Sequence, residues 1–586
     1  MAGGLIQLVA YGSQDMYLTG NPQITFFKSV YRRHTNFSIE SINQTLTGSS
    51  NFGGSLKSIL SRAGDLIHKM YLEIPLPAID LVDNLQSNHA VAFRWLNWIG
   101  HILIKEIKIT IGGQEIDKQS GEWLHIWNEL TQKREKSEAY AEMVGNVPKL
   151  TQIYSTDSGA TSGSCTVEAY NLHIPLQFWF NRNAGLALPI IALQYHDIEV
   201  SIELETLDKC MWGHLIKHET DGSMNTTSSN TNYLVAQGDS IFTTSSGYQG
   251  GTAPKLGNVK LFVDYIFLDT QERQRFSQVA HEYLIEVVQT KINKTIPVNA
   301  AEPNTTSLNA LSHPVKELVW VIQPNKFKDK SFTQTRGGNQ NFNFTDQYDY
   351  SGFTGTPESY WGPGLRGGRG TQNIFYGMPT VKIQGQMNQD SVDTDNFLGG
   401  IETTSLAFTD ANAKKNINAI GFADVMNYTR LATSNPVDKR YLENLMGPTL
   451  AEPVSSTENS VGLWTGTNNN IKVLDGGKNP TQKAKITLNG NDRFSERNGD
   501  YFNVIQPYNH HTSVPAPGIN VYSFALRPEE YQPSGTCNFS RIDDAQLEIT
   551  ELTTQVKKYN SSIRVYAVAY NVLRIMSGMG GLAYSS

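Results

Sequence analysis

The sequence is poor in cysteine and in charged side chains, and it has no long apolar run. Its 3 cysteines in 586 residues form an odd, widely spaced set that fits neither a disulfide framework nor a zinc site, so we expect a reducing compartment. The 18% of charged residues and the net charge of −7 argue against nucleic-acid binding by the whole surface, which would need a basic surface. The most apolar window, residues 95–104, is about half the roughly 20 residues that a membrane span needs.

Signals for secretion, catalysis and cofactor binding are missing as well. The beginning, MAGGLIQLVA, has no basic segment, so we expect no secretory signal peptide. No G-x-x-x-x-G-K-[ST] loop occurs, and His281-Glu282 lacks the second histidine of a zinc-protease helix. Residues 362–367 (GPGLRG) match a dinucleotide loop by letters only, because a proline interrupts them and no strand precedes them. We therefore expect no enzyme activity and no cofactor.

Each of the remaining polar clusters can be interpreted as a functional site or as an ordinary structural feature. The structural interpretation is favoured for all of them, because the residue spacing alone does not supply the full set of ligands or catalytic groups that a site needs. The clusters are Asp390, Asp393 and Asp395 (calcium loop or ordinary loop), Arg366 and Arg369 (RNA-binding segment or ordinary loop), His510-His511 (metal pair without a partner cluster), Asp543-Asp544 (catalytic pair, or a turn or salt-bridging pair) and His68 (metal ligand or hydrogen-bonded histidine).

What the sequence does contain is alternation of apolar and polar residues, which predicts a mainly β protein with a few short helices. The abundance of glycine (49) and proline (23) fits strands joined by many loops. The sequence predicts helices over 90–99 and 120–132, the second with helical spacing of its apolar residues and an N-cap at Ser120. Residues 269–277 are predicted as a short charged helix or a turn. Residues 35–76 are predicted to form strands, with clear alternation at 65–74. The other predicted strands are 102–111, 176–180, 196–205, 258–268, 281–290, 315–322, 501–506, 520–526, 542–550 and 562–575.

Two related strand–loop–strand arrangements, 177–205 and 520–550, indicate two β domains of one kind. We place their boundary near Lys255. The first domain then covers 35–254 and the second covers 255–586, with long loop insertions within about 325–500. Residues 1–34 precede both as an arm. This arm carries a basic cluster of Lys28, Arg32, Arg33 and His34, which is either a solvated segment or a contact to an acidic partner or membrane surface.

Several stretches of the chain resemble the major capsid protein of nucleocytoplasmic large DNA viruses, including its mimivirus-like branch. They occur in the family's order from the first residues to the last. They are GGLIQLVAYGSQDMYLTGNPQITFFKSVYRRHTNF (from Gly3), FWFNRNAGLALPIIALQYHDIEV (from Phe178), VDYIFLDTQERQRFSQVAHEYLIE (from Val263), HPVKELVWV (from His313), QPSGTCNFSRIDDAQLEI (from Gln532) and YNVLRIMSGMGGLAY (from Tyr570).

This resemblance implies two tandem antiparallel jelly-roll β-sandwiches and a structural role without catalysis. It further implies a homotrimer that acts as a pseudo-hexagonal capsomer of an icosahedral virion shell, made and assembled in the host cytoplasm. The implied partners are neighbouring capsomers, minor capsid proteins, a penton protein at the vertices and, through partners, an internal membrane. The arm would lie at the inner side of the shell, which favours a partner contact for Lys28, Arg32 and Arg33. No specific nucleic-acid binding is expected.

A second function class fits a loop-rich β-sandwich, namely carbohydrate binding or cleavage. Aromatic loop residues stack on sugars, and a pair of carboxylates about 5–10 Å apart would cleave them. The loop aromatics that prompt this alternative are Tyr348, Tyr350, Tyr360 and Trp361. Glycan binding and a glycosidase assay discriminate between the two classes.

Overall fold

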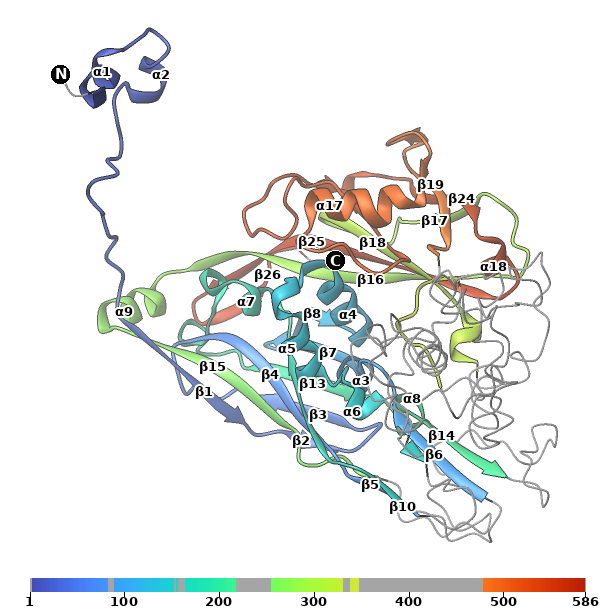
Figure 1. Cartoon of the computed structure of the whole chain (residues 1–586). Coiled ribbons are helices and arrows are strands. Elements are labelled where there is room, and N and C mark those ends of the chain that lie inside the picture. The colour runs from blue at the N-terminus through green and yellow to red at the C-terminus, as the bar shows by residue number, and fades with distance from the viewer. Residues whose placement is uncertain are drawn as a thin grey trace, which may run out of the picture.

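The chain folds into two β-sandwiches preceded by an extended arm (Figure 1). The computed structural model describes residues 3–82, 89–151, 154–155, 164–217, 254–329, 338–346 and 478–584. Most of the predicted insertion within 325–500 lies outside these residues. No helix in the described ranges is both long and apolar enough to cross a bilayer.

The first sandwich consists of two antiparallel sheets that face each other across an apolar core. One sheet has the order β1-β15-β4-β11, and the other has the order β3-β13-β7-β8 with the short β2 (Thr47–Gly48) beside β3. In chain order its eight main strands are β1 (Phe37–Gln44), β3 (Ser55–Ile59), β4 (Leu66–Leu76), β7 (Ile104–Ile111), β8 (Gln114–Gln119), β11 (Tyr170–Pro175), β13 (Ile198–Leu204) and β15 (Lys260–Leu268).

The second sandwich repeats this plan. Its sheets have the orders β16-β25-β18-β22 and β17-β24-β19-β20. In chain order the strands are β16 (His281–Ile296), β17 (Asn304–Ser307), β18 (Pro314–Pro324), β19 (Thr481–Leu488), β20 (Asn491–Asp492), β22 (Ile519–Ser523), β24 (Ala545–Leu552) and β25 (Ser561–Met576).

Strand order shows that the two sandwiches share one topology. Numbered one to eight along the chain, the strands of each sandwich form a sheet 1-8-3-6 and a sheet 2-7-4-5. This pairing of two four-stranded antiparallel sheets is the double Greek key of a jelly roll. The predicted fold of two tandem antiparallel jelly rolls is therefore confirmed.

The boundary between the sandwiches differs from the predicted one. Strand β15 pairs with β1 and with β4, so Lys260–Leu268 completes the first sandwich. The division by strand pairing falls after Leu268, and α9 (Thr270–Gln278) leads from there into β16. The sequence placed the boundary near Lys255 because a strand pattern does not reveal which sheet the strand joins.

Shorter elements decorate this frame. The minor strands are β5 (Ile79–Val82), β6 (His89–Trp95), β9 (Tyr154–Ser155), β10 (Ser164–Val167), β12 (Leu188–Pro189), β14 (Met211–Lys217), β21 (Arg497–Asn498), β23 (Cys537–Asn538) and β26 (Met579–Leu582). The helices are α1 (Gly3–Val9), α2 (Met16–Thr19), α3 (Ile99–Leu103), α4 (Gly121–Thr131), α5 (Ser137–Val144), α6 (Pro148–Thr151), α7 (Trp179–Arg182), α8 (Leu207–Cys210), α9, α17 (Gln506–His510) and α18 (Thr554–Lys557).

Three of the predicted elements are wrong. Residues 90–99, predicted as helix, largely form β6, which pairs with β14. Residues 176–180, predicted as strand, lead into the helical turn α7. Residues 501–506, also predicted as strand, are helical. All three are short apolar runs, for which periodicity does not separate a strand from a buried helix.

The helix predicted over 120–132 is confirmed as α4, and it joins the two sandwiches (Figure 1). The Ser120 Oγ accepts a hydrogen bond from the Trp123 backbone N–H (3.2 Å), which satisfies one free donor of the first turn. Leu124 belongs to the core of the first sandwich, whereas Trp123 and Trp127 pack against the second. Both faces of α4 are thus buried, one against each sandwich.

Candidate functional site

The predicted contact residues Lys28, Arg32 and Arg33 lie on the amino-terminal arm, which Figure 1 shows leaving the body at the start of β1. All three are exposed, and within the described residues no hydrogen bond or ion pair engages their side chains. The structure brings them close to one another in the chain but not to any acidic group of the body. They are available to a partner.

The arm also presents an unusual number of apolar side chains to solvent. None of the side chains described between residues 3 and 36 is buried. Contiguous exposed apolar surface of this kind marks a binding segment more often than a free tail. The exposed large apolar residues of the arm are Leu5, Ile6, Leu8, Val9, Tyr11, Met16, Tyr17, Leu18, Ile24, Phe26, Phe27, Val30 and Tyr31.

The junction between the sandwiches is the second candidate site, and its centre is apolar. The α4 residues Trp123, Ile126, Trp127 and Leu130 lie at i, i+3, i+4 and i+7, which places them on one face of the helix. They pack on the outer face of the sheet β16-β25-β18-β22. The residues they meet there include Val288, Val319, Val321, Ile519, Val521, Tyr566 and Val568.

An ion pair fixes the register of α4 on this sheet. The Arg564 Nε donates to Glu122 Oε1 (2.5 Å), and the Tyr566 hydroxyl donates to the same oxygen (2.6 Å). Arg564 and Tyr566 alternate with core residues on β25, so both point toward α4. A carboxylate with two donors, largely closed to solvent, gives the junction a fixed orientation that apolar packing alone does not supply.

A buried charge cluster extends the junction to one side. Lys316 and Glu317 are neighbours on β18, and both are fully buried. The pairing of β18 with β25 shifts register between Val315 and Glu317, and this bulge lets Lys316 reach Glu286 of β16. Lys316 Nζ lies 2.6 Å from Glu286 Oε1. Arg182 Nη1, from the first sandwich, lies 3.1 Å from Glu286 Oε2. Glu286 therefore joins cations from both sandwiches.

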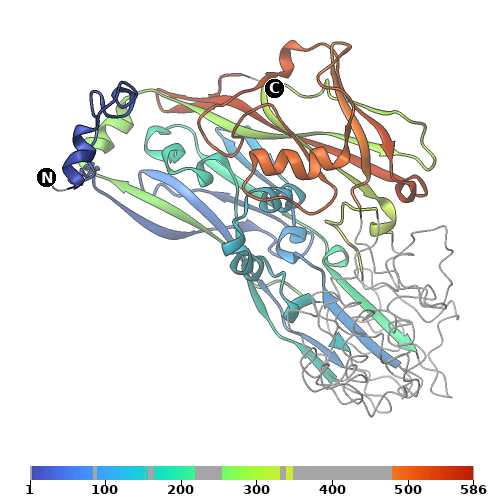
Figure 2. The same cartoon turned by 45° about the horizontal axis from the view of Figure 1, so that its top comes forward.

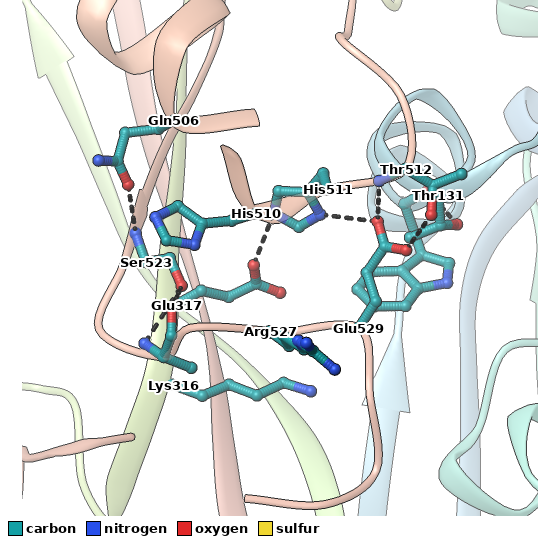
Figure 3. Close-up of polar contacts among 12 residues, drawn as sticks. Thr131, Lys316, Glu317, Gln506, His510, His511, Thr512, Ser523, Arg527 and Glu529 are labelled. Carbon is teal, nitrogen blue, oxygen red and sulfur yellow. Dashed lines mark hydrogen bonds and ion pairs between the residues drawn. The ribbon is translucent and has the colours of Figure 1, made fainter. Parts of the chain in front are cut away.

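Glu317 is matched by a histidine from the loop that follows α17 (Figure 3). His511 Nε2 lies 2.9 Å from Glu317 Oε2, and His511 Nδ1 lies 3.0 Å from Glu529 Oε1. Burial alone would lower the pKa of His511, but the two carboxylates outweigh it and raise the pKa to about 9. His511 is therefore a cation at neutral pH. Burial would raise the pKa of Glu317, yet His511 holds it below its usual value.

The polar clusters noted in the sequence have structural explanations where they are described. The His68 Nδ1 is 2.7 Å from the Phe180 carbonyl, as a hydrogen-bonded histidine should be. His511 is occupied by carboxylates, and no group of metal-ligating side chains occurs among the described residues. The backbone N–H groups of Asp543 and Asp544 donate to Asn489 Oδ1, so this pair connects the start of β24 to the turn between β19 and β20.

Other sequence candidates lie outside the described residues. They are the GPGLRG match at 362–367, Arg366 and Arg369, the aspartates 390, 393 and 395, and the loop aromatics Tyr348, Tyr350, Tyr360 and Trp361.

Sequence reasoning missed the junction charges. A signal was present, because two adjacent charges interrupt the apolar strand VKELVWVI (315–322), where a buried strand has no solvent for them. Their partners Glu286, Arg182 and His511 are distant in sequence, and only the fold brings them together.

Comparisons with known proteins agree with this architecture. The family model "Major capsid protein N-terminus" matches residues 25–269, and the model "Large eukaryotic DNA virus major capsid protein" matches residues 272–581. The major capsid protein of Phaeocystis pouchetii virus is 40% identical, and capsid protein 1 of Acanthamoeba polyphaga mimivirus is 35% identical. Both alignments cover 100% of each chain.

A solved structure is also similar. The chain in the quasi-atomic model of the PBCV-1 virus capsid has 27% sequence identity and a TM-score of 0.52, with 96% of this chain and 100% of that chain covered. The two family models meet between residues 269 and 272, where strand pairing divides the sandwiches. The chain therefore belongs to the family of large eukaryotic DNA virus major capsid proteins.

Proposed function

We propose that three copies of this chain form a pseudo-hexagonal capsomer that tiles an icosahedral shell. As a member of its family, the chain is a structural protein of the virion capsid and not an enzyme. The observation that carries the proposal is the shared strand order of the two sandwiches. Three chains contribute six sandwiches of one topology, so a threefold ring presents six similar sides to its neighbours.

The proposal includes further partners. Neighbouring capsomers surround each trimer, a penton protein closes the vertices, and assembly takes place in the host cytoplasm. The arm, with Lys28, Arg32 and Arg33 among exposed apolar residues, binds an acidic surface at the inner side of the shell. That surface belongs to a minor capsid protein or, through one, to an internal membrane.

Light scattering on the purified full chain tests the trimer. The expected mass is three times the 65.2 kDa of one chain, and electron micrographs should show hexagonal outlines. Protein that stays monomeric at micromolar concentration contradicts the proposal.

Cross-linking of intact particles tests the arm. An amine-reactive reagent should join Lys28 to a second protein species, which mass spectrometry identifies. Lys28 cross-links that stay within copies of this chain contradict an inner partner.

A further inference from the structure

The helical stretch 499–510 of the second sandwich is the counterpart of α4 in the first. Each helix lies in the connection between the fifth and sixth strands of its sandwich, that is, between β8 and β11 and between β20 and β22. The two begin alike, with Gly121-Glu122-Trp123 in one and Gly499-Asp500-Tyr501 in the other.

The two first glycines also pack alike. A Cβ on Gly121 would clash with the carbonyl oxygens of His101 and Ile104, where β7 begins. A Cβ on Gly499 would clash with the carbonyl oxygen of Thr481, where β19 begins. β7 and β19 are the fourth strands of their sandwiches, so both helices start against the same part of the fold.

The helices differ in what covers them. Helix 499–510, whose residues 501–505 form a π-helical turn, has apolar residues at 501, 504, 505 and 508. This is the same sequence spacing as 123, 126, 127 and 130 of α4, although Tyr501 packs against the core of its own sandwich. On α4 these residues are buried against the neighbouring sandwich. On helix 499–510 the side chains of Val504, Ile505 and Tyr508 are 44%, 46% and 78% exposed. Figure 2 shows this orange helix at the surface of the second sandwich.

The surface that α4 covers has a counterpart as well. On β25, the eighth strand of the second sandwich, Arg564 and Tyr566 face α4. On β15, the eighth strand of the first, Lys260 and Phe262 repeat this basic-x-aromatic pattern, and they alternate with the core residues Leu261 and Val263. Phe262 stacks on Tyr71 of β4, with ring centroids 5.0 Å apart, on the outer face of the sheet.

This outer face is partly open to solvent at its edge strand. Phe37 and Ile39 of β1 are 53% and 52% exposed, and they pair with Leu268 and Ile266 of β15. The chain thus carries a helix with an unburied apolar face and a sheet whose outer face is partly exposed and presents the aromatic and aliphatic side chains of Phe262, Phe37 and Ile39 among polar residues. These are the counterparts of the two surfaces that meet at its own junction.

We infer that helix 499–510 of one copy packs on the outer face of β1-β15-β4-β11 of a second copy, repeating between chains the contact that α4 makes within one. Asp500 then occupies the place of Glu122 and adds a second carboxylate to Lys260 of the neighbour, whose Nζ lies 2.8 Å from Glu73 Oε1 of its own chain. Val504, Ile505 and Tyr508 cover Phe262 and the exposed side chains of β1. The inference rests on the proposed trimer and names the surface that forms it. The contact is heterologous, so it closes into a ring when three copies supply six sandwiches.

A charge placed in the apolar centre of the contact tests this surface. The variant Ile505→Glu should be monomeric at concentrations where the unmodified chain is trimeric, because a carboxylate opposite Phe262 has no partner. Ile59→Glu is the matched control, since Ile59 is 64% exposed on β3, in the other sheet. Circular dichroism and thermal unfolding should match for both variants. A trimeric Ile505→Glu would overturn the inference.

Cysteine cross-linking between different chains provides the second test. Chains with Asp500→Cys and chains with Lys260→Cys are mixed, assembled and oxidised, and peptides are mapped by mass spectrometry. A disulfide between residues 500 and 260 of two different chains supports the contact. The absence of this linkage in trimers overturns the inference and leaves the proposed trimer standing, whereas an unmodified chain that is monomeric overturns both.

Discussion

His511 and Glu317 form an ion pair whose two side chains are fully closed to solvent, with 2.9 Å between Nε2 and Oε2. Their elements are far apart in sequence, so the pair holds the loop after α17 onto β18. A buried pair that loses one partner leaves an uncompensated charge, which is more costly than the loss of the pair itself.

The first prediction concerns this pair. Replacing His511→Ala should destabilise the protein by about 3–5 kcal/mol, because Glu317 remains buried without its cation. Denaturant unfolding measures the change. The neighbouring His510→Ala should cost less than about 1 kcal/mol, since His510 makes one hydrogen bond in an exposed position. The double variant Glu317→Leu/His511→Leu should be more stable than His511→Ala. Equal midpoints for His511→Ala and the unmodified chain would contradict the role of the pair.

The second prediction is a loss of stability in alkali. The Glu317 and Glu529 carboxylates raise the folded-state pKa of His511 to about 9 against burial, whereas the pKa in the unfolded chain is the ordinary histidine value of 6.5. The stabilising contribution is therefore complete below pH 6.5 and is lost as the pH rises through about 9. Urea midpoints between pH 6 and pH 10, taken for the unmodified chain and for His511→Ala, isolate this contribution. Parallel curves for the two proteins would refute it.

The third prediction concerns acid. Burial lowers the pKa of His101 to about 3, and burial together with the His101 charge lowers the pKa of His125 well below 6.5. A depressed histidine pKa contributes stability above the unfolded value of 6.5, and this stability is lost as the pH falls. Because His125 stacks on Phe342 with centroids 4.4 Å apart, His125→Phe keeps the ring and removes the titration. Its acid unfolding midpoint should move to lower pH, while the exposed His34→Phe should leave it unchanged.

The fourth prediction uses the paired glycines. In most helices a glycine-to-alanine change is stabilising by about 0.5–1 kcal/mol. At Gly121 and Gly499 the added methyl group would meet backbone oxygen, so each change should instead destabilise by at least about 1–3 kcal/mol. Gly185→Ala is the control, since its nearest neighbour is the tip of the Asn183 side chain at 3.3 Å. If Gly185→Ala had a lower thermal unfolding midpoint than Gly121→Ala and Gly499→Ala, the packing argument would be wrong.

The fifth prediction concerns the arm. Deletion of residues 3–34 should leave the unfolding free energy within about 0.5 kcal/mol of the full chain, because no described side chain there is buried. Calorimetry on both proteins measures this. A large loss of stability would mean that the arm packs on the body.

The sequence was sufficient for the long alternating strands and for the plan of two β domains, because alternation over seven or more residues, as in 196–205 or 562–575, indicates a half-buried strand directly. It failed at 90–99, where an apolar run without clear alternation lies opposite β14 and becomes a strand. It failed again at 501–506, whose helical spacing appears only when Tyr508 is counted with it.

For the candidate sites too, the sequence revealed what is local in the chain and missed what the fold brings together. The exposed cluster of Lys28, Arg32 and Arg33 is local in sequence, and the structure shows these residues to be exposed. The junction cluster depends on Arg182, Glu286 and His511 meeting across the fold, so no spacing rule reveals it. The odd position of Lys316 next to Glu317 within an apolar strand was the one local sign of it.

The place of β25 in the sheet has a consequence for synthesis on the ribosome. This strand, Ser561–Met576, lies between β16 and β18, yet it is nearly the last part of the chain to emerge. Until it arrives, the surface that receives Trp123 and Trp127 does not exist, although α4 was translated more than 400 residues earlier. Nascent chains therefore hold two tryptophans without a complete docking surface for most of translation, which proceeds at about 5–20 residues per second. Messages truncated before codon 561 would yield products that expose this face permanently, and such products are natural substrates for chaperones and proteases.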